Sequence, residues 1–183
     1  MDVVKRKITR AAWSRVRLFV MDVDGVLTDG TVAISSDGTE TKTFCITDGL
    51  GLILVRKAGL ETAWISGRQS VTTTLRAAEL RVPHCVQGRH DKLAALTELA
   101  ASLGVPLRDC AYMGDDFIDA PAIAAAGIGI SVPTALPAAL AAADYVTRRN
   151  AGRGAVREVC DLILDAHGAP SGNTRPRGRT KSP

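Results

Sequence analysis

Acidic, hydroxyl and basic side chains follow a series of short apolar segments in this chain. Asp22 and Asp24 come directly after the apolar run Leu-Phe-Val-Met at 18–21. Carboxylates placed close together repel each other unless a positive group lies between them. The pair therefore forms either a solvated polar turn or part of a site for a cation. Further groups of this kind follow later apolar segments: Ser66-Gly67-Arg68, Lys92, and Gly114-Asp115-Asp116 with Asp119.

Together these groups have the chemistry of a site for a divalent cation and an oxyanion. Carboxylate and main-chain oxygens are hard ligands that suit Mg²⁺, which keeps several waters and shares an oxygen of a phosphate group. A hydroxyl, a guanidinium and an ammonium group supply hydrogen bonds and positive charge to the same anion. Such a site requires that residues far apart in the sequence meet at one place.

An alternation of apolar strands and helical segments would bring them together. Strands are predicted at 17–22, 61–66, 84–86, 109–113, 128–132 and 144–147, and helices at 49–58, 69–80, 91–103, 116–126, 136–142 and 155–166. This pattern predicts a three-layer α/β fold, with a mostly parallel sheet and helices on both faces. Ligands bind such sheets at the carboxyl ends of the strands, which is where the polar groups fall.

The segment 31–46 departs from this alternation. Its arms are rich in Thr, Val, Ile and Phe and flank Ser36-Asp37-Gly38, which predicts a β-hairpin inserted after the first acidic motif. It is too short to be a cap domain. A lone hairpin is marginal in water, and its edges invite pairing with another chain. We therefore expect the apolar hairpin residues to contact other subunits: Val32, Ile34, Phe44 and Ile46.

The charge of the chain is unevenly distributed. The formal net charge is +4, but residues 18–167 hold 13 basic and 18 acidic side chains, a balance of −5. The remaining charge is basic and lies at the two ends, as is typical of solvated tails. We expect one domain over 16–167, a basic N-terminal extension over 1–15 and a disordered basic tail over 168–183.

Composition also argues against several classes of function. Only 4% of residues are aromatic, which disfavours nucleic-acid binding by base stacking. The uncharged stretch 120–143 is interrupted by Gly127, Gly129, Pro133 and Pro137, so we do not expect it to span a membrane. The four cysteines are scattered, without a Cys-x-x-Cys pair, which argues against a zinc site or a disulfide framework and fits a cytoplasmic protein.

The motifs resemble those of the haloacid dehalogenase superfamily of aspartate-nucleophile phosphatases. DVDGVLTDG matches the first motif, the serine of ISGR the second, Lys92 the third and GDDFID the fourth. Four motifs in this order, each after a predicted strand, are a specific signal. The resemblance extends over about residues 16–167 and implies a Rossmann-like fold. With the hairpin, TDGLG, ADYVT and AGRGAVREVCDLIL, the chain looks like the capless sugar-acid phosphatases, in particular those of 3-deoxy-D-manno-octulosonate 8-phosphate in lipopolysaccharide synthesis.

This resemblance implies a role for each motif residue. Asp22 would be the nucleophile that forms an aspartyl-phosphate, and Asp24 the general acid and then the general base. Mg²⁺ would be held by Asp22, by the main-chain carbonyl of Asp24 and by Asp115. Ser66 and Lys92 would bind the phosphoryl group. Plainer interpretations remain open, since Ser66 suits a helix cap and Lys92 a solvated helix position.

The resemblance also implies substrate contacts and an assembly. The expected assembly is a homotetramer, in which residues 150–158 can reach a neighbour's site. Relatives often have Tyr where Leu50 stands and a basic residue where Ile53 stands, which opens the alternative of a nonulosonate 9-phosphate or another small sugar phosphate. Asp48 suits an N-cap equally well, and the arginines could be exposed. The substrate contacts implied are Asp24, Cys45, Ile46, Thr47, Asp48, Gly49, Ile53, Arg68, Arg76 and Lys92.

Two other functions fit the sequence less well than a small-molecule phosphatase does. A catalytically silent regulatory domain would have lost the nucleophile or the motif lysine, and this chain retains both Asp22 and Lys92. A phosphatase of nucleic-acid ends could use the basic tails, but the low aromatic content argues against it. A small-molecule phosphatase is the interpretation that the motifs favour.

Overall fold

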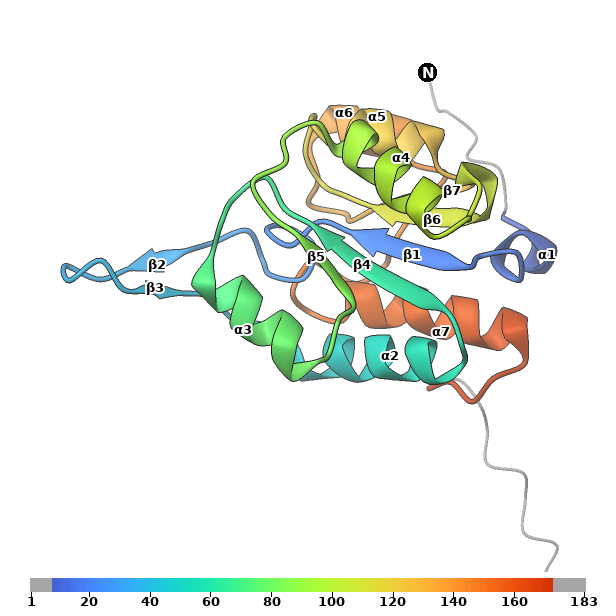
Figure 1. Ribbon diagram of the computed structural model, residues 1–183, viewed down its shortest axis with the longest axis horizontal. Helices are drawn as coiled ribbons and strands as arrows, with labels where there is room; N and C mark the ends of the chain where they lie inside the picture. Colours follow the sequence, from blue (N-terminus) through green and yellow to red (C-terminus); the bar gives the residue numbers. More distant parts are fainter. Residues whose placement is uncertain (1–7, 173–183) are drawn as a thin grey trace, which may run out of the picture.

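The computed structural model describes residues 8–172 and confirms the predicted α/β fold (Figure 1). Six strands form one sheet in the order β5-β4-β1-β6-β7-β8, and every neighbouring pair is parallel. The strands are β1 (Leu18–Met21), β4 (Glu61–Ile65), β5 (His84–Val86), β6 (Cys110–Met113), β7 (Ile128–Ser131) and β8 (Tyr145–Val146).

Helices cover both faces of this sheet. On one face lie α2 (Ile46–Lys57), α3 (Val71–Glu79) and α7 (Ala155–His167), and on the other lie α4 (Lys92–Ser102), α5 (Ala120–Ala125) and α6 (Pro137–Ala142) (Figure 1). A 3-10 turn, Leu107–Asp109, leads into β6.

Strand β1 shows why the sheet is buried on both sides. All four of its residues are fully buried, and they alternate between two cores as the pleat requires. Phe19 and Met21 pack with α2 and α7, whereas Leu18 and Val20 pack with α4 and α5. A continuous apolar run is typical of a central parallel strand.

Two helices that begin near the carboxyl edge of the sheet have side-chain caps. Ser70 Oγ accepts a hydrogen bond from the amide of Thr73 at the start of α3. Asp91 Oδ1 accepts one from Ala94 and starts α4, so that Lys92 is the first residue of that helix. These local signals place two of the sequence motifs at helix N-termini.

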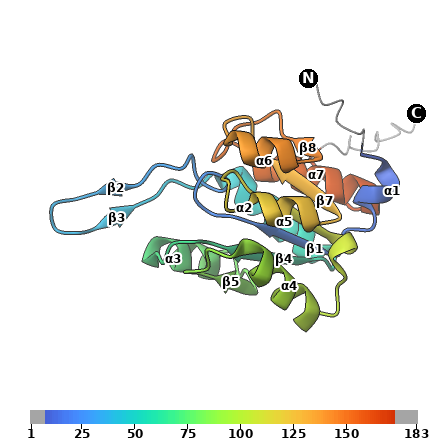
Figure 2. The ribbon, with the colours of Figure 1, turned by 90° about the horizontal axis from the view of Figure 1, so that it is seen from above.

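The hairpin extends away from the domain (Figures 1 and 2). Its strands are short and antiparallel: β2 (Ala33–Ile34) and β3 (Glu40–Thr41). The following helix α2 begins at Ile46, three residues before the predicted start at 49, with Cys45 as its N-cap residue. Asp48 then lies in the first turn of α2, where a negative charge suits the helix dipole.

The boundaries of the domain are wider than expected. Residues 10–13 form the short helix α1 (Arg10–Trp13), and Trp13 is 5% exposed and packs edge-on against Tyr145. Ala169 packs on the same core after α7. Burial of a large aromatic ring outweighs the basic character of the surrounding residues. The predicted extension and tail otherwise lie outside the described residues, at 1–7 and 173–183.

Within residues 8–172, no helix has the length and apolar character that crossing a membrane would need.

Candidate active site

Asp22 comes directly after β1, and its main chain continues the hydrogen bonding of that strand with β6. Its amide donates to the carbonyl of Met113 at 2.9 Å, so Asp22 extends the pairing of β1 with β6. The chain then turns, and the amide of Val23 donates to Asp22 Oδ1 at 2.6 Å. Asp22 Oδ2 faces Lys92 Nζ at 2.9 Å. The side chain is therefore held at both oxygens.

Lys92 is a buried cation rather than a solvated helix residue. Its side chain is fully buried, and its ammonium group donates to the carbonyl of Ile65 at 2.8 Å. The same group lies 2.9 Å from Asp22 and 3.3 Å from Asp119. An ammonium at this position neutralises part of the acidic cluster and leaves charge for an incoming phosphate.

Asp119 organises the loop after β6. Its Oδ1 accepts from the hydroxyl of Tyr112 at 2.8 Å, and its Oδ2 accepts from the amides of Asp115 and Asp116 at 3.2 and 3.1 Å. With Lys92 also in contact, both oxygens of Asp119 are engaged. Asp119 thus holds the loop that presents Asp115.

Asp22, Asp115 and Asp119 form an acidic cluster that fits a divalent cation. One oxygen from each lies within 4.8 Å of the others, and the buried Oδ1 of Asp115 has no hydrogen-bond partner among the described residues. Burial raises the pKa of Asp115 to about 8, with repulsion from Asp22 and Asp119 adding to it. Burial and Asp119 likewise raise the pKa of Asp22 to about 7, although Lys92 opposes this. A bound cation would remove the repulsion that raises both pKa values.

Gly25 allows Asp115 to approach the first motif. Gly25 has φ +87°, and a Cβ at this position would lie 2.0 Å from Asp115 Oδ2. We expect Gly25→Ala to displace Asp115 and to weaken divalent-cation binding by about 10- to 100-fold, the range seen when the support of a metal ligand is lost. Titration calorimetry with the metal measures this.

Gly38→Ala is the matched control for this substitution. Gly38 has a similar φ of +84° at the hairpin turn, and a Cβ there would have no neighbour within 4 Å among the described residues. The control introduces the same backbone strain, of roughly 1–2 kcal/mol, without the clash. Equal cation affinity in Gly25→Ala and Gly38→Ala would contradict the assignment of Asp115 as a ligand.

A small cavity opens above this cluster. Its volume is about 180 Å³, and it is lined by Asp22, Asp24, Ser66, Gly67, Arg68, His90, Asp115, Asp116 and Ile118. Ser66 follows β4, and its buried hydroxyl accepts from the amide of Arg68 at 3.2 Å. Arg68 is half-exposed at the rim, and its guanidinium lies 3.9 Å from Asp24. The four predicted motifs therefore meet at one edge of the sheet.

Several known proteins are similar to this chain in sequence. The model of the haloacid dehalogenase-like hydrolase family matches residues 82–159. The 3-deoxy-D-manno-octulosonate 8-phosphate phosphatase KdsC of Escherichia coli K12 is 42% identical over 153 residues, which is 84% of this chain and 81% of the relative. The Yersinia pestis protein of the same name is 44% identical over 167 residues, 91% of this chain and 88% of the relative. The chain belongs to the KdsC family of haloacid dehalogenase-like hydrolases.

A solved structure of this family supports the same conclusion. The 3-deoxy-D-manno-octulosonate 8-phosphate phosphatase of Moraxella catarrhalis, crystallised with a magnesium ion, a phosphate ion and a KDO molecule, matches with a TM-score of 0.85 at 47% identity. The match covers 87% of this chain and 91% of that one. The predicted family, fold and enzyme class, a phosphoric monoester hydrolase, are confirmed.

Several substrate contacts implied by the family resemblance lie outside the cavity. Asp48 is buried, and it accepts from the amides of Arg157 at 2.6 Å and Gly154 at 3.3 Å, so it caps α7 in this chain, and its contact with substrate stays a prediction. Its side chain caps a helix other than its own, because the start of α2 packs against the start of α7.

Arg76 pairs with Glu79 at 2.7 Å and lies over the ring of Phe44. Ile53 packs on the core. The residues Cys45, Ile46, Thr47, Asp48, Gly49, Ile53 and Arg76 do not line the cavity.

Residues 150–158 contact the first motif within their own chain. The amide of Gly152 donates to the carbonyl of Val26 at 3.1 Å, and Gly152 packs closely on the backbone at Thr28 and Asp29. Asp29 itself is exposed and accepts from Thr31, so this acidic residue of the motif does not join the cluster. The reach of 150–158 to a neighbouring site stays a prediction.

Sequence reasoning missed a buried lysine at the base of the hairpin. Lys42 Nζ lies 2.7 Å from Asp24 Oδ1, and the Lys42 side chain is fully buried. A signal was present in the sequence, because Glu40, Lys42 and Phe44 occur at alternate positions of the predicted hairpin arm, and alternate residues of an extended segment share a face. Phe44 on that face stacks on Trp64 at 6.4 Å, which indicates that the charged residues also point inward.

Proposed function

We propose that this protein is a Mg²⁺-dependent phosphatase that hydrolyses 3-deoxy-D-manno-octulosonate 8-phosphate to 3-deoxy-D-manno-octulosonate and phosphate. The observation that carries the proposal is the position of Asp22, which lines the cavity, pairs with Lys92 and belongs to the acidic cluster with Asp115 and Asp119. The names of the KdsC relatives and the ligands of the Moraxella structure support the substrate.

In the proposed reaction, the chain supplies the nucleophile and moves one proton. An oxygen of Asp22 attacks the phosphorus, the bond from phosphorus to the sugar oxygen breaks, and Asp24 gives its proton to that oxygen. Water then attacks the phosphorus of the aspartyl-phosphate, and Asp24 takes a proton from the water. The bond between phosphorus and Asp22 breaks, and phosphate leaves with the carboxylate of Asp22 restored.

Other residues of the site bind and neutralise the phosphoryl group. The Ser66 hydroxyl and the Lys92 ammonium are placed to donate to its oxygens, and Arg68 supplies positive charge at the rim. When bound by Asp22, the main-chain carbonyl of Asp24 and Asp115, Mg²⁺ would supply further positive charge to the same oxygens.

A phosphate-release assay over a panel of substrates tests the proposal. The panel contains 3-deoxy-D-manno-octulosonate 8-phosphate, a nonulosonate 9-phosphate, glucose 6-phosphate and p-nitrophenyl phosphate. We expect kcat/KM to be highest on the first by a factor of at least about ten, the discrimination that a few differing contacts provide. A preference for the nonulosonate 9-phosphate would favour the alternative substrate. The absence of turnover on all four substrates would favour a silent regulatory domain.

We further propose that the protein assembles through the face that carries the hairpin. Within the described chain, five of the seven exposed large apolar side chains lie on the hairpin, the start of α2 or α3. Ile34 is 70% exposed and Val71 is 76% exposed. Burial of each such side chain contributes about 1.5–3 kcal/mol. A homotetramer is the expected assembly, and it would bring the hairpin of one subunit near the cavity of another. The apolar face consists of Ile34, Ile46, Leu50, Val71 and Leu75.

A charge on this apolar face is expected to break the assembly. Ile34→Glu should convert the tetramer to monomers, because the new carboxylate would have to be buried without a partner. Light scattering at micromolar concentration measures the mass. Leu136→Glu is the control, since Leu136 is also exposed, at 49%, but lies beside α6 on the other face of the sheet. Wild-type protein that is monomeric at this concentration would contradict the proposal.

We place the enzyme in the cytoplasm, in lipopolysaccharide synthesis. All four cysteines are free, and two of them, Cys110 and Cys160, are buried. Free thiols persist in a reducing compartment, which supports this location.

A further inference from the structure

Lys42 is a charged side chain that the fold buries completely outside the four motifs. It follows β3 directly, at the base of the hairpin. Its ammonium group lies 2.7 Å from Asp24 Oδ1, 3.3 Å from Thr73 Oγ1 and 3.8 Å from Glu40 Oε1. A buried ammonium is costly unless it is paired, so Asp24 is the partner that makes this position tolerable.

Asp24 is contacted by cations from two different segments. Lys42 approaches Oδ1, and Arg68 approaches Oδ2 at 3.9 Å. The side chain of Arg68 is 47% exposed, whereas that of Lys42 is fully buried. Because a buried side chain has fewer available rotamers than an exposed one, Lys42 is the contact that restricts the orientation of the Asp24 carboxyl group.

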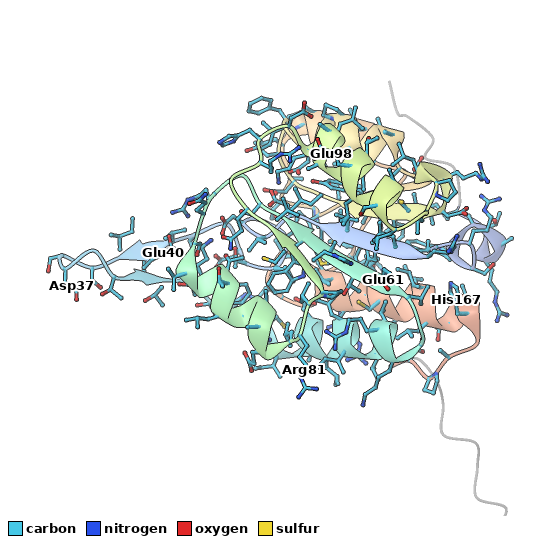
Figure 3. The ribbon with its side chains drawn as sticks, in the orientation of Figure 1. Asp37, Glu40, Glu61, Arg81, Glu98 and His167 are labelled. Carbon is cyan, nitrogen blue, oxygen red and sulfur yellow. The ribbon has the colours of Figure 1, made fainter. Side chains whose placement is uncertain are left out.

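The base of the hairpin is itself fixed to α3. Glu40 accepts from Arg68 at 2.8 Å and from the hydroxyl of Ser70, and its carbonyl accepts from Thr72 at 3.3 Å. Figure 3 shows Glu40 beside the start of α3 and Asp37 at the far end of the hairpin. Phe44, two residues beyond Lys42, stacks on Trp64. Lys42 is therefore held between two anchored residues, Glu40 and Phe44, that lie two positions before and after it.

We propose that Lys42 is a positioning residue that holds the carboxyl group of Asp24 for proton transfer in the subunit's own active site. The hairpin base is thus part of the catalytic arrangement of each chain, independent of any contact between subunits. The inference rests on the proposed role of Asp24 as general acid and base.

The leaving group of the substrate reports on this role. An alkoxide leaving group, as in a sugar phosphate, needs a proton as the bond to phosphorus breaks, whereas p-nitrophenolate leaves without one. Misplacement of Asp24 should therefore slow formation of the aspartyl-phosphate from the first class of substrate and spare it for the second. The later attack of water, in which Asp24 is the base, is common to both classes, so the comparison uses kcat/KM, which reports the first step alone. A general loss of folding or of phosphate binding would slow both classes equally.

The test compares Lys42→Met with four other variants on both substrates. We expect Lys42→Met to lower kcat/KM on the sugar phosphate about 100-fold and kcat/KM on p-nitrophenyl phosphate less than about threefold, in line with the contribution of a positioned proton donor. Lys57→Met replaces an exposed lysine at the end of α2 and should change neither rate. Glu40→Gln weakens the hairpin anchor but keeps Lys42, and should lower both rates by the same small factor. Asp24→Asn and the double variant Asp24→Asn/Lys42→Met complete a double-mutant cycle, which measures the coupling between the two residues.

Each outcome decides the inference. If Lys42 acts through Asp24, the double variant is no slower than Asp24→Asn. Two results would overturn the role of Lys42 while leaving that of Asp24 intact. One is that Lys42→Met loses the same factor on both substrates. The other is that Glu40→Gln shows a leaving-group dependence as large as that of Lys42→Met. If Asp24→Asn keeps its rate on the sugar phosphate, the proposed role of Asp24 itself is wrong. Should Lys42→Met fail to fold, as judged by its melting temperature, Thr73→Val removes the hydrogen bond that the ammonium donates to Thr73 and should show the same leaving-group dependence more weakly.

Discussion

Asp22→Asn is expected to lower kcat by a factor of about 10⁴ or more, equivalent to roughly 5.5 kcal/mol of barrier. The amide keeps the size of the side chain, but it removes the attacking charge and an anionic ligand of the cation. Asp22 lies 2.9 Å from Lys92, so the variant also breaks the ion pair that neutralises this lysine. Steady-state phosphate release on the sugar phosphate measures the loss.

The fold should survive this substitution. Burial and Asp119 raise the pKa of Asp22 to about 7, which means that its charge is unfavourable in the metal-free protein. Asp29→Asn is the matched control, because Asp29 is an exposed aspartate of the same motif whose side chain accepts hydrogen bonds from Thr31. It should keep wild-type activity. A rate above about a tenth of wild type in Asp22→Asn, a loss under about 1.4 kcal/mol, would contradict nucleophilic catalysis by Asp22.

Removal of divalent metal is expected to abolish activity. Treatment with EDTA should reduce turnover to background, and Mg²⁺ should restore it, because the phosphate oxygens and the cluster of Asp22, Asp115 and Asp119 are all negative. Ca²⁺ should bind but support little turnover, since its longer and more flexible coordination misplaces the phosphoryl group. Full activity in chelator, or with Ca²⁺ in place of Mg²⁺, would contradict the proposed site.

The thermal stability of the protein should reveal binding of the same cation without an activity assay. The folded-state pKa values of Asp22 and Asp115, about 7 and about 8, lie above the ordinary value of 3.8. The folded protein therefore binds more protons than the unfolded chain, and the metal-free protein should lose stability as the pH rises from about 4 to about 8. Protons compete with Mg²⁺ for these carboxylates, so Mg²⁺ should raise the Tm more at pH 8 than at pH 6.

Asp115→Asn is the control for this measurement. It removes one carboxylate and should reduce both the loss of stability toward pH 8 and the effect of Mg²⁺ on the Tm. A Tm in wild-type protein that Mg²⁺ does not change at pH 8 would show that the cluster does not bind the cation.

The sequence alone predicted the sheet, the position of its functional edge and the four motifs. Asp22 follows a fully apolar run, and such a run between charged residues is typical of a buried strand, whose carboxyl end faces ligands. Asp91 precedes Lys92 and caps α4, so this lysine is placed at a helix start by a local signal. These features depend on periodicity and capping, which are properties of neighbouring residues.

The tertiary structure decided which of the remaining polar residues join the site. Asp48 matched a substrate position by resemblance, yet it caps α7, 109 positions further along the chain. Lys42 matched no motif, yet it is buried against Asp24 because β3 is fixed to α3. Trp13 lies in a segment with a basic composition, yet it packs in the core. Local patterns report the preferences of single segments, whereas the partner of a buried charge or ring depends on which segments pack together, and that is settled only when the whole chain has folded.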